Sequence, residues 1–273
     1  EAVNILIPSS VLLFLYFSYT RKNRLIIFLI LFLSISLFIS IGFRSRVILL
    51  VLPCYFIYYF SQNKRPPVIK SIIYSLSLLA GSSFVELTRL YYAGLNFKNL
   101  DFSLNRFLFT AFSESNVFIT TSLEIKTVPS ELPFVGIRPI LETIYKFTPS
   151  QFGLKFDQPY YEDIINNIYG IIDAPGAAHL GFAEYYLMGG WIGLIISGLF
   201  YGYFLKIFWR WFLSNPYDYL RQAIYFTSLG FIFLLFSRGF LPQIFTFYIY
   251  IIGPLILIKG FSSNIKSKQR MRP

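Results

Sequence analysis

An apolar run without a polar face is the feature that most constrains this chain. Residues 25–41 read LIIFLILFLSISLFISI, in which only serines interrupt the large apolar side chains. A helix that is apolar all round belongs in a lipid bilayer or in the core of a helix bundle. Similar runs recur along the chain, and 14% of its residues are charged, compared with about 25% in soluble domains. We therefore expect an integral membrane protein.

Several stretches approach the roughly 20 apolar residues that cross a bilayer. They are residues 3–19, 25–41, 46–60, 68–90, 180–208, 219–237 and 240–258. These stretches predict an all-α fold, a polytopic transmembrane helix bundle of about seven spans. The expected organisation is transmembrane helices 1–4 in residues 1–90, a large loop in 91–179, helices 5–7 in 180–260 and a basic tail in 261–273.

The long connection between the fourth and fifth expected spans differs in composition from the rest. Residues 91–179 carry nine of the 13 acidic residues. They also contain six prolines, Pro129, Pro133, Pro139, Pro149, Pro159 and Pro175. A connection of this length is too long for a simple linker and predicts a folded extramembrane region. Within it, residues 136–152 predict a short amphipathic helix on the membrane surface, with Ile140, Leu141, Ile144 and Phe147 on one side.

The basic residues indicate the orientation of the spans. With seven alternating spans, fourteen of the 24 Lys and Arg residues fall on one side, namely Arg21, Lys22, Arg24, Lys64, Arg65, Lys70, Lys206, Arg210, Arg221, Lys259, Lys266, Lys268, Arg270 and Arg272. Asp218 is the acidic residue on that side. Short loops rich in Lys and Arg face the cytoplasm. The large acidic loop is therefore expected on the outside, in the periplasm or the extracellular space.

Four arginines lie on the side where the positive-inside rule disfavours them. Arg44 and Arg46 lie in GFRSRVILL, Arg89 ends the fourth expected span, and Arg238 lies in the turn FSRGFLPQ. We call these four the outward arginines. Guanidinium groups bind phosphate oxygens in a fixed bidentate geometry, so we expect the outward arginines, together with Arg138 of the loop, to bind a lipid-linked diphosphate. The alternative is that they anchor at lipid head groups or pair locally, as Arg89 could with Glu86.

Residues 176–202, GAAHLGFAEYYLMGGWIGLIISGLFYG, combine two ionisable side chains with a series of glycines. Glycines allow transmembrane helices to approach closely. Glu184 is costly in an apolar helix and is therefore expected to be paired or functional. His179 has an ordinary pKa near neutrality, which suits a general base. We expect His179 or Glu184 to be catalytic, with Asp173 as a third candidate, while an interfacial anchor is the alternative for His179.

Metal and disulfide chemistry has little support in the composition. The chain has one cysteine, Cys54, and one histidine, His179, too few for a disulfide framework or a zinc site made by the protein. It also lacks an Asp–x–Asp pair that could hold a divalent metal. A metal-independent reaction without a cofactor is therefore expected. The net charge of +11 is distributed around the spans and does not indicate binding of nucleic acid.

Three stretches resemble motifs of a known family. GFRSRVILLVLP (42–53), the glycine-containing stretch 176–202 and FSRGFL (236–241) are similar to segments of the bacterial oligosaccharide repeat-unit polymerases, the O-antigen polymerase (Wzy) family, which is related to the O-antigen ligases. The resemblance implies a bundle like that of C-type glycosyltransferases. Family members carry more than seven spans, and this chain begins at Glu1 close to an apolar run. An N-terminal part of a longer protein is therefore expected to precede it.

The resemblance also implies an activity and partners. A glycosyltransferase of this family polymerises undecaprenyl-diphosphate-linked oligosaccharides into a surface polysaccharide, such as O-antigen of lipopolysaccharide, capsule or exopolysaccharide. The reaction would take place at the outer face of the bacterial cytoplasmic (inner) membrane, among membrane lipids. A chain-length regulator and a flippase would be partners.

Other functions remain open at this stage. The ligases have a histidine near the end of the large loop, comparable to His179, which leaves an O-antigen ligase as a close alternative. A transporter or flippase for lipid-linked oligosaccharides is a non-enzyme alternative. Charges at mid-depth and internal symmetry would be expected of it, and neither is evident in the sequence. A membrane scaffold for other glycan enzymes is a further alternative, although it would not need the outward arginines.

Overall fold

The computed structural model describes residues 2–20, 24–41, 44–74, 76–77, 81, 116–146, 148, 159–169 and 179–270. These residues are predominantly helical, with no strand among them. The chain divides into two compact units. Unit 1 combines residues 1–113, 212–230 and 250–273, and unit 2 combines residues 114–211 and 231–249.

Four helices among the described residues are long and apolar enough to cross a membrane. They are Val3–Thr20, Gly181–Leu213, Tyr219–Ser237 and Leu241–Phe261. Two further apolar helices, Leu25–Ser40 and Ser45–Ser61, are shorter. The fourth expected span, 68–90, lies mostly outside the described residues. The all-helical fold is thus confirmed for the described residues, with four helices able to span a membrane, while the count of seven spans stays a prediction.

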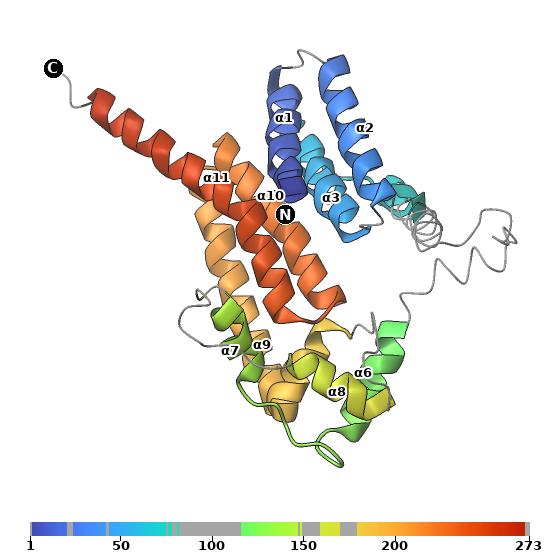
Figure 1. Ribbon diagram of the computed structural model, residues 1–273. Helices are drawn as coiled ribbons and strands as arrows, with labels where there is room; N and C mark the ends of the chain where they lie inside the picture. Colours follow the sequence, from blue (N-terminus) through green and yellow to red (C-terminus); the bar gives the residue numbers. More distant parts are fainter. Residues whose placement is uncertain are drawn as a thin grey trace, which may run out of the picture. The chain divides into compact units, whose positions relative to one another are not determined.

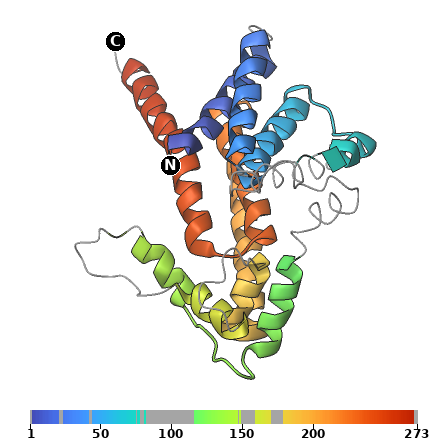
Figure 2. The same cartoon turned by 45° about the vertical axis from the view of Figure 1, so that its right-hand side comes forward.

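The N-terminal part of unit 1 is a group of three packed helices. A short 3-10 helix, η1 (Ala2–Ile5), leads into α1 (Leu6–Thr20), which is followed by α2 (Arg24–Ser40) and α3 (Arg44–Ser61). The three α-helices pack against one another (Figures 1 and 2). Their buried side chains are mainly aliphatic, among them Ile7, Val11, Leu15, Leu49, Leu50 and Ile57. The hydroxyls of Ser10 and Ser34 lie 3.2 Å apart in this interior, so each of these two buried hydroxyls has a partner.

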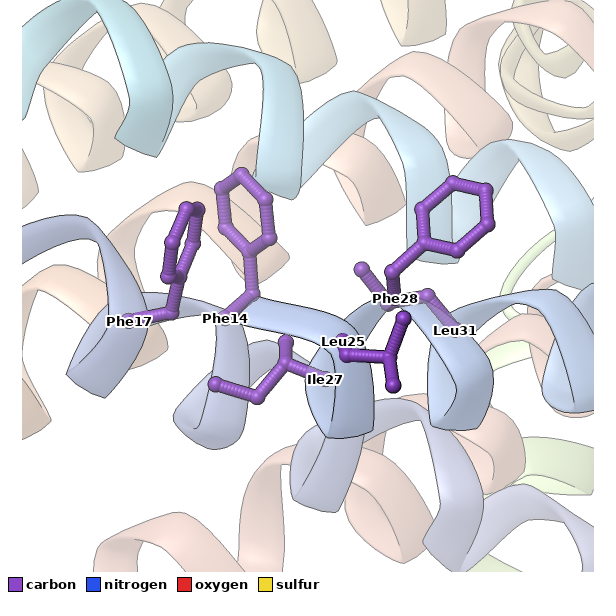
Figure 3. A pocket seen from close by; sticks show the side chains of 6 residues that line it. All are labelled: Phe14, Phe17, Leu25, Ile27, Phe28 and Leu31. Carbon is purple, nitrogen blue, oxygen red and sulfur yellow. The ribbon is translucent and has the colours of Figure 1, made fainter. Parts of the chain in front are cut away.

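An apolar pocket of about 470 Å³ lies on the hairpin formed by α1 and α2. Its lining is Phe14 and Phe17 of α1 and Leu25, Ile27, Phe28 and Leu31 of α2 (Figure 3). Leu25 and Phe28 are 80% and 69% exposed. Such a surface is expected where a helix hairpin faces lipid, because lipid tails are as apolar as these side chains and exposing the side chains to them carries no penalty.

Unit 1 also contains the start of α10 (Tyr219–Ser237) and the later part of α11 (Leu241–Arg270). Asp218 caps α10 with Oδ1, which accepts the N–H groups of Leu220 and Arg221 at 2.9 and 3.1 Å. Its Oδ2 lies 3.3 Å from Nζ of Lys259 on α11. Burial alone would raise the pKa of Asp218, but the Arg221 N–H and the Lys259 ammonium lower it below its ordinary value. The acidic residue on the basic side therefore ties two helices together.

Unit 2 contains the helices that the structure describes in the long acidic region. Its helices are α6 (Asn116–Thr127), α7 (Arg138–Lys146), α8 (Tyr160–Tyr169) and the greater part of α9 (Gly181–Leu213). Helices α6 and α8 lie side by side (Figures 1 and 2). The core consists of Val128, Tyr160, Ile164 and Leu187, with Leu132, Val135 and Phe240 packed against them. The expected amphipathic helix in 136–152 is confirmed as α7, whereas Phe147 lies outside the described residues.

Helix α9 is broken by two glycines. Gly189 has φ −171° and ψ 31°, and Gly190 has φ 62° and ψ −144°, so the ribbon changes direction there (Figure 1). The second conformation favours glycine. Ahead of the break, Ala183 and Leu187 are fully buried, whereas Trp191 and Ile192 just after it are 69% and 70% exposed. The first two turns thus belong to the packed part of unit 2, and the lipid-facing surface of α9 begins after Gly190.

Candidate functional site

Two of the sequence motifs come together at the turn between α10 and α11. The main-chain N–H of Gly239 donates to the carbonyl oxygen of His179 at 2.7 Å. The N–H of Phe240 donates to Oε2 of Glu184 at 3.0 Å, and the N–H of Leu241 to Oε1 at 2.9 Å and Oε2 at 3.0 Å. The first N–H groups of a helix have no partner within it, and a negative charge is favourable there. Glu184 therefore caps α11 from a neighbouring helix.

Gly239 is required where His179 packs on this turn. A Cβ atom built on Gly239 would overlap Cδ2 and Nε2 of the His179 ring. Gly181 shows the same closeness, because a Cβ there would overlap the main-chain oxygen of Leu235 on α10. The start of α9 and the end of α10 thus approach so closely that both contact points need glycine.

Tyr160, at the start of α8, connects the loop helices to Glu184. Its side chain is completely buried, and its hydroxyl donates a short hydrogen bond to Oε1 of Glu184. Burial raises the pKa of Tyr160 well above its ordinary value, and the neighbouring Glu184 carboxylate raises it further. The phenol therefore stays protonated and serves as a donor. The Glu184 carboxylate accepts from three residues, Tyr160, Phe240 and Leu241, which fits the rule that buried charges need several partners.

His179 pairs with an acidic residue that lies far away in the sequence. Its Nδ1 lies 2.8 Å from Oε1 of Glu124 on α6, and the two side chains are 1% and 0% exposed. The next residue, Leu180, donates its N–H to Oγ1 of Thr121 at 2.9 Å, which adds a second bond to α6. Burial lowers the pKa of His179, but the hydrogen bond and charge of Glu124 and the charge of Glu184 outweigh it, so the pKa is raised. The surroundings of His179 therefore favour its protonated form more than water does.

Arg138, at the start of α7, is held by two carboxylates. Its Nε lies 3.0 Å from Oε1 of Glu142, and its NH1 lies 2.9 Å from Oδ2 of Asp163. The same Glu142 oxygen accepts the main-chain N–H of Tyr160 at 2.9 Å. Burial raises the pKa of Glu142, and the Tyr160 N–H and Arg138 partly offset this. A series of contacts thus runs from Arg138 through Glu142 and Tyr160 to Glu184.

The predicted site residues separate into three groups. Unit 2 contains Arg138, His179, Glu184 and Arg238. Of these, His179 and Glu184 are buried around the turn, while Arg238 lies in the turn itself with an exposed side chain.

The other predicted residues belong to unit 1 or lie outside the described residues. In unit 1, Arg46 is half-buried and donates from Nε to Oδ1 of Asn4 at 2.7 Å. Arg44 begins α3, and its side chain is outside the described part. Arg89 and Asp173 also lie outside the described residues.

Sequence reasoning missed four residues of this network, Glu124, Glu142, Tyr160 and Asp163. For Glu124 a signal existed. The buried residues Val117, Thr120, Thr121, Glu124 and Val128 follow the spacing of one helix face. An acidic residue within such a face needs a partner, and the lone histidine of the chain was available. Tyr160 and Asp163 carry no comparable signal, because tyrosine and aspartate are also common on the exposed faces of helices like α8.

The site contains a hydrogen-bonded turn that carries the positively charged residue Arg238. Among the described residues, no group of three or more His, Cys, Asp and Glu side chains could hold a metal ion. Comparisons with protein-family models, curated proteins and solved structures find no match for this chain. The function therefore has to be argued from the geometry around the turn.

Proposed function

We propose that this protein is a membrane glycosyltransferase that polymerises lipid-diphosphate-linked oligosaccharide units. The observation that carries the proposal is the turn between α10 and α11. It carries Arg238, a residue of the exposed class, and its next three residues are hydrogen-bonded to His179 and Glu184. A cation held on a rigid turn at the end of two spans is suited to an anionic group at the membrane surface.

Glycosyl transfer from a lipid diphosphate needs such a cation. As the glycosidic bond to the diphosphate breaks, negative charge develops on the departing phosphate oxygens. Positive groups positioned in advance stabilise this charge without reorganising during the reaction. In the proposal, Arg238 has this role. Arg138 is the second arginine of unit 2, and Arg44, Arg46 and Arg89 remain further candidates for diphosphate binding.

The buried residues are assigned a positioning role. A general base must come within hydrogen-bond reach of the acceptor hydroxyl. His179 and Glu184 are 1% and 0% exposed. The His179 ring is bonded to Glu124 and packs on Gly239, and the Glu184 carboxylate accepts N–H groups of the turn. The geometry therefore favours positioning of Arg238 over direct proton transfer. The expectation that His179, Glu184 or Asp173 is the base stays a prediction.

The proposal includes the outward location of this turn. The hydrogen bond between Gly239 and His179 requires that the end of the long acidic region and the α10–α11 turn lie on the same side of the membrane. This agrees with the alternation of spans predicted from the basic residues. In the proposal that side is the periplasmic face of a bacterial inner membrane, the chain has seven spans, and the bundle is of the C-type glycosyltransferase kind.

The test is a reaction with purified full-length protein in lipid vesicles. The substrate is an undecaprenyl-diphosphate-linked oligosaccharide from the host, supplied with a chelator of divalent metals. A ladder of products differing by one repeat unit would support the polymerase. Transfer of a single glycan to a different acceptor would indicate a ligase. Movement of the intact lipid across the bilayer without transfer would indicate a transporter, and both of these outcomes would overturn the proposal.

A further inference from the structure

We propose that α7 is an interfacial helix, with its apolar face immersed in the outer leaflet of the membrane just below the head groups. The proposal concerns the surface of unit 2 and does not require the proposed glycosyl transfer, although the choice of the outer leaflet rests on the outward location proposed above. The sequence predicted an amphipathic helix on the membrane surface here, and the structure adds which residues are exposed and what contacts the two ends.

The exposed face of α7 is the apolar one. Ile137, just before the helix, and Ile140 and Ile144 within it are 64%, 42% and 54% exposed, and their spacing places them on one side. The inner side carries the polar contacts. There Glu142 bonds to Arg138 and to the N–H of Tyr160. A helix facing water would have the opposite arrangement, with apolar residues inside and charges outside. An apolar outer face with polar contacts inside is favourable where the helix is surrounded by hydrocarbon.

The beginning of α7 is bound to the point where α9 becomes lipid-facing. The N–H of Val135 donates to the carbonyl oxygen of Leu187 at 2.9 Å. The Phe134 ring is so close to Gly190 that a Cβ there would lie 3.1 Å from Cζ. Trp191 and Ile192, which follow this glycine, are strongly exposed and apolar. The start of α7 is therefore continuous with the surface of α9 that must contact lipid.

The other end of α7 contacts the ends of two further apolar helices. Nζ of Lys146, in the last turn, lies 6.0 Å from the ring centroid of Phe240, in the turn between α10 and α11. One end of α7 is thus held at the α9 break and the other at the end of two further apolar helices. A short helix held at two such points lies along the membrane surface. An exposed lysine at its end also suits anionic lipid head groups.

Membrane lipid is therefore a better occupant for this face than a second protein. Phe134, an exposed aromatic residue just ahead of α7, packs on Gly190, where the exposed apolar surface of α9 begins. Amphipathic helices of this kind bury their apolar side about 5–10 Å into the boundary between head groups and acyl chains.

The experiment measures the surroundings of spin labels on the full chain in vesicles of phosphatidylethanolamine and phosphatidylglycerol. Cys54 is the one cysteine and is first replaced by Ala. Single cysteines are then introduced at Ile140 and Ile144 and labelled. Glu131, exposed in the turn after α6, is the water control, and Ile195, 63% exposed on α9, is the lipid control. Each position is exposed, so labelling should leave the fold intact, which gel filtration and the unfolding temperature verify.

Collisions with oxygen and with a water-soluble nickel chelate decide the outcome. Labels at Ile140 and Ile144 should collide with oxygen several-fold more, and with the nickel chelate several-fold less, than the label at Glu131, and so resemble Ile195. Accessibility to the nickel chelate equal to that at Glu131 would place the face in water. Low accessibility to both reagents would place it against protein, a second copy included. Either of these two results would overturn the proposal.

Discussion

The main-chain N–H of Gly239 donates a 2.7 Å hydrogen bond to the main-chain oxygen of His179, and the His179 ring occupies the space where a side chain at 239 would begin. This contact joins the segment ahead of α9 to the turn between α10 and α11. The hydrogen bonds of the turn to His179 and Glu184 thus position the segment that carries Arg238.

Gly239→Ala is expected to destabilise the protein. The added methyl group would overlap the imidazole of His179, and relieving such overpacking in a well-packed region costs about 1–3 kcal/mol. Gly198→Ala in α9 is the matched control, because a Cβ there meets no atom within 4 Å. Unfolding temperatures in detergent should fall for the first variant and not for the second. Equal behaviour of the two variants would contradict the close contact.

Glu184 should matter more for stability than Tyr160. Tyr160→Phe removes one hydrogen bond to a carboxylate, which is worth about 1.5–3 kcal/mol. Glu184→Gln removes the charge at the start of α11 and directs an amide N–H₂ group at one of its donors. We expect a larger loss of unfolding free energy for Glu184→Gln than for Tyr160→Phe, measured by denaturation of the purified protein. The reverse order would show that Glu184 is not the centre of the network.

The His179–Glu124 pair should make stability depend on pH. Burial lowers the pKa of His179, but Glu124 and Glu184 raise it more, so the folded-state pKa lies above the ordinary 6.5. A raised histidine pKa means that the stabilisation is complete below about pH 6.5 and is lost as the pH rises through the folded-state value. The unfolding temperature should therefore decrease from pH 6.5 toward alkaline pH.

The control for this pH dependence is His179→Gln, which removes the titrating group and should flatten the decrease. The difference between the wild-type and variant curves isolates His179 from other titrating residues. Two curves that remain parallel from about pH 5.5 to about pH 9.5 would show that His179 binds its proton equally well in the folded and the unfolded protein, and would contradict a raised pKa.

Arg238 is expected to act on turnover rather than on stability. Loss of a group that stabilises charge in the transition state lowers turnover by about 10²- to 10³-fold. Arg238→Ala should show such a loss in the polymerisation reaction while unfolding at the wild-type temperature. Lys126→Ala, which removes an exposed charge from α6, is the matched control and should retain activity. Equal rates for the two variants would remove Arg238 from the proposed site.

The two carboxylates around Arg138 should contribute unequally. The Arg138–Asp163 pair is partly exposed, at 32% and 35%, and such pairs contribute about 1 kcal/mol or less. Glu142 is 9% exposed and also accepts the N–H of Tyr160. Glu142→Gln should therefore lower the unfolding free energy more than Asp163→Asn does. Similar losses would indicate that the contact between Glu142 and Tyr160 adds little.

The sequence predicted much of the fold because a bilayer leaves the chain few choices. Long apolar runs must form helices there, so the spans that end near Thr20, Ser237 and Phe261 could be predicted closely. The break at Gly189–Gly190 could not, because glycines are also common in unbroken transmembrane helices. As a result Glu184 was expected within a span, whereas the structure places it in the packed segment ahead of the break.

The sequence singled out several residues of the candidate site but did not predict which of them contact one another. The stretches containing His179, Glu184 and Arg238 were singled out because charged groups are unusual next to apolar helices. Which of them meet depends on the packing of distant segments, and no local pattern contains that information. Glu124 shows this limit most clearly, since its partner His179 lies beyond two other helices in the sequence.

The glycine break also has a consequence for hydrophobic matching. An unbroken helix of the 33 residues Gly181–Leu213 would be about 50 Å long, far beyond the roughly 30 Å of a hydrocarbon core. With the break, only the portion after Gly190 has to match the bilayer, and mismatch of a few Å can be absorbed by tilting that portion. Membranes of different thickness should thus accommodate α9 at small energetic expense, without lengthening or shortening its apolar sequence.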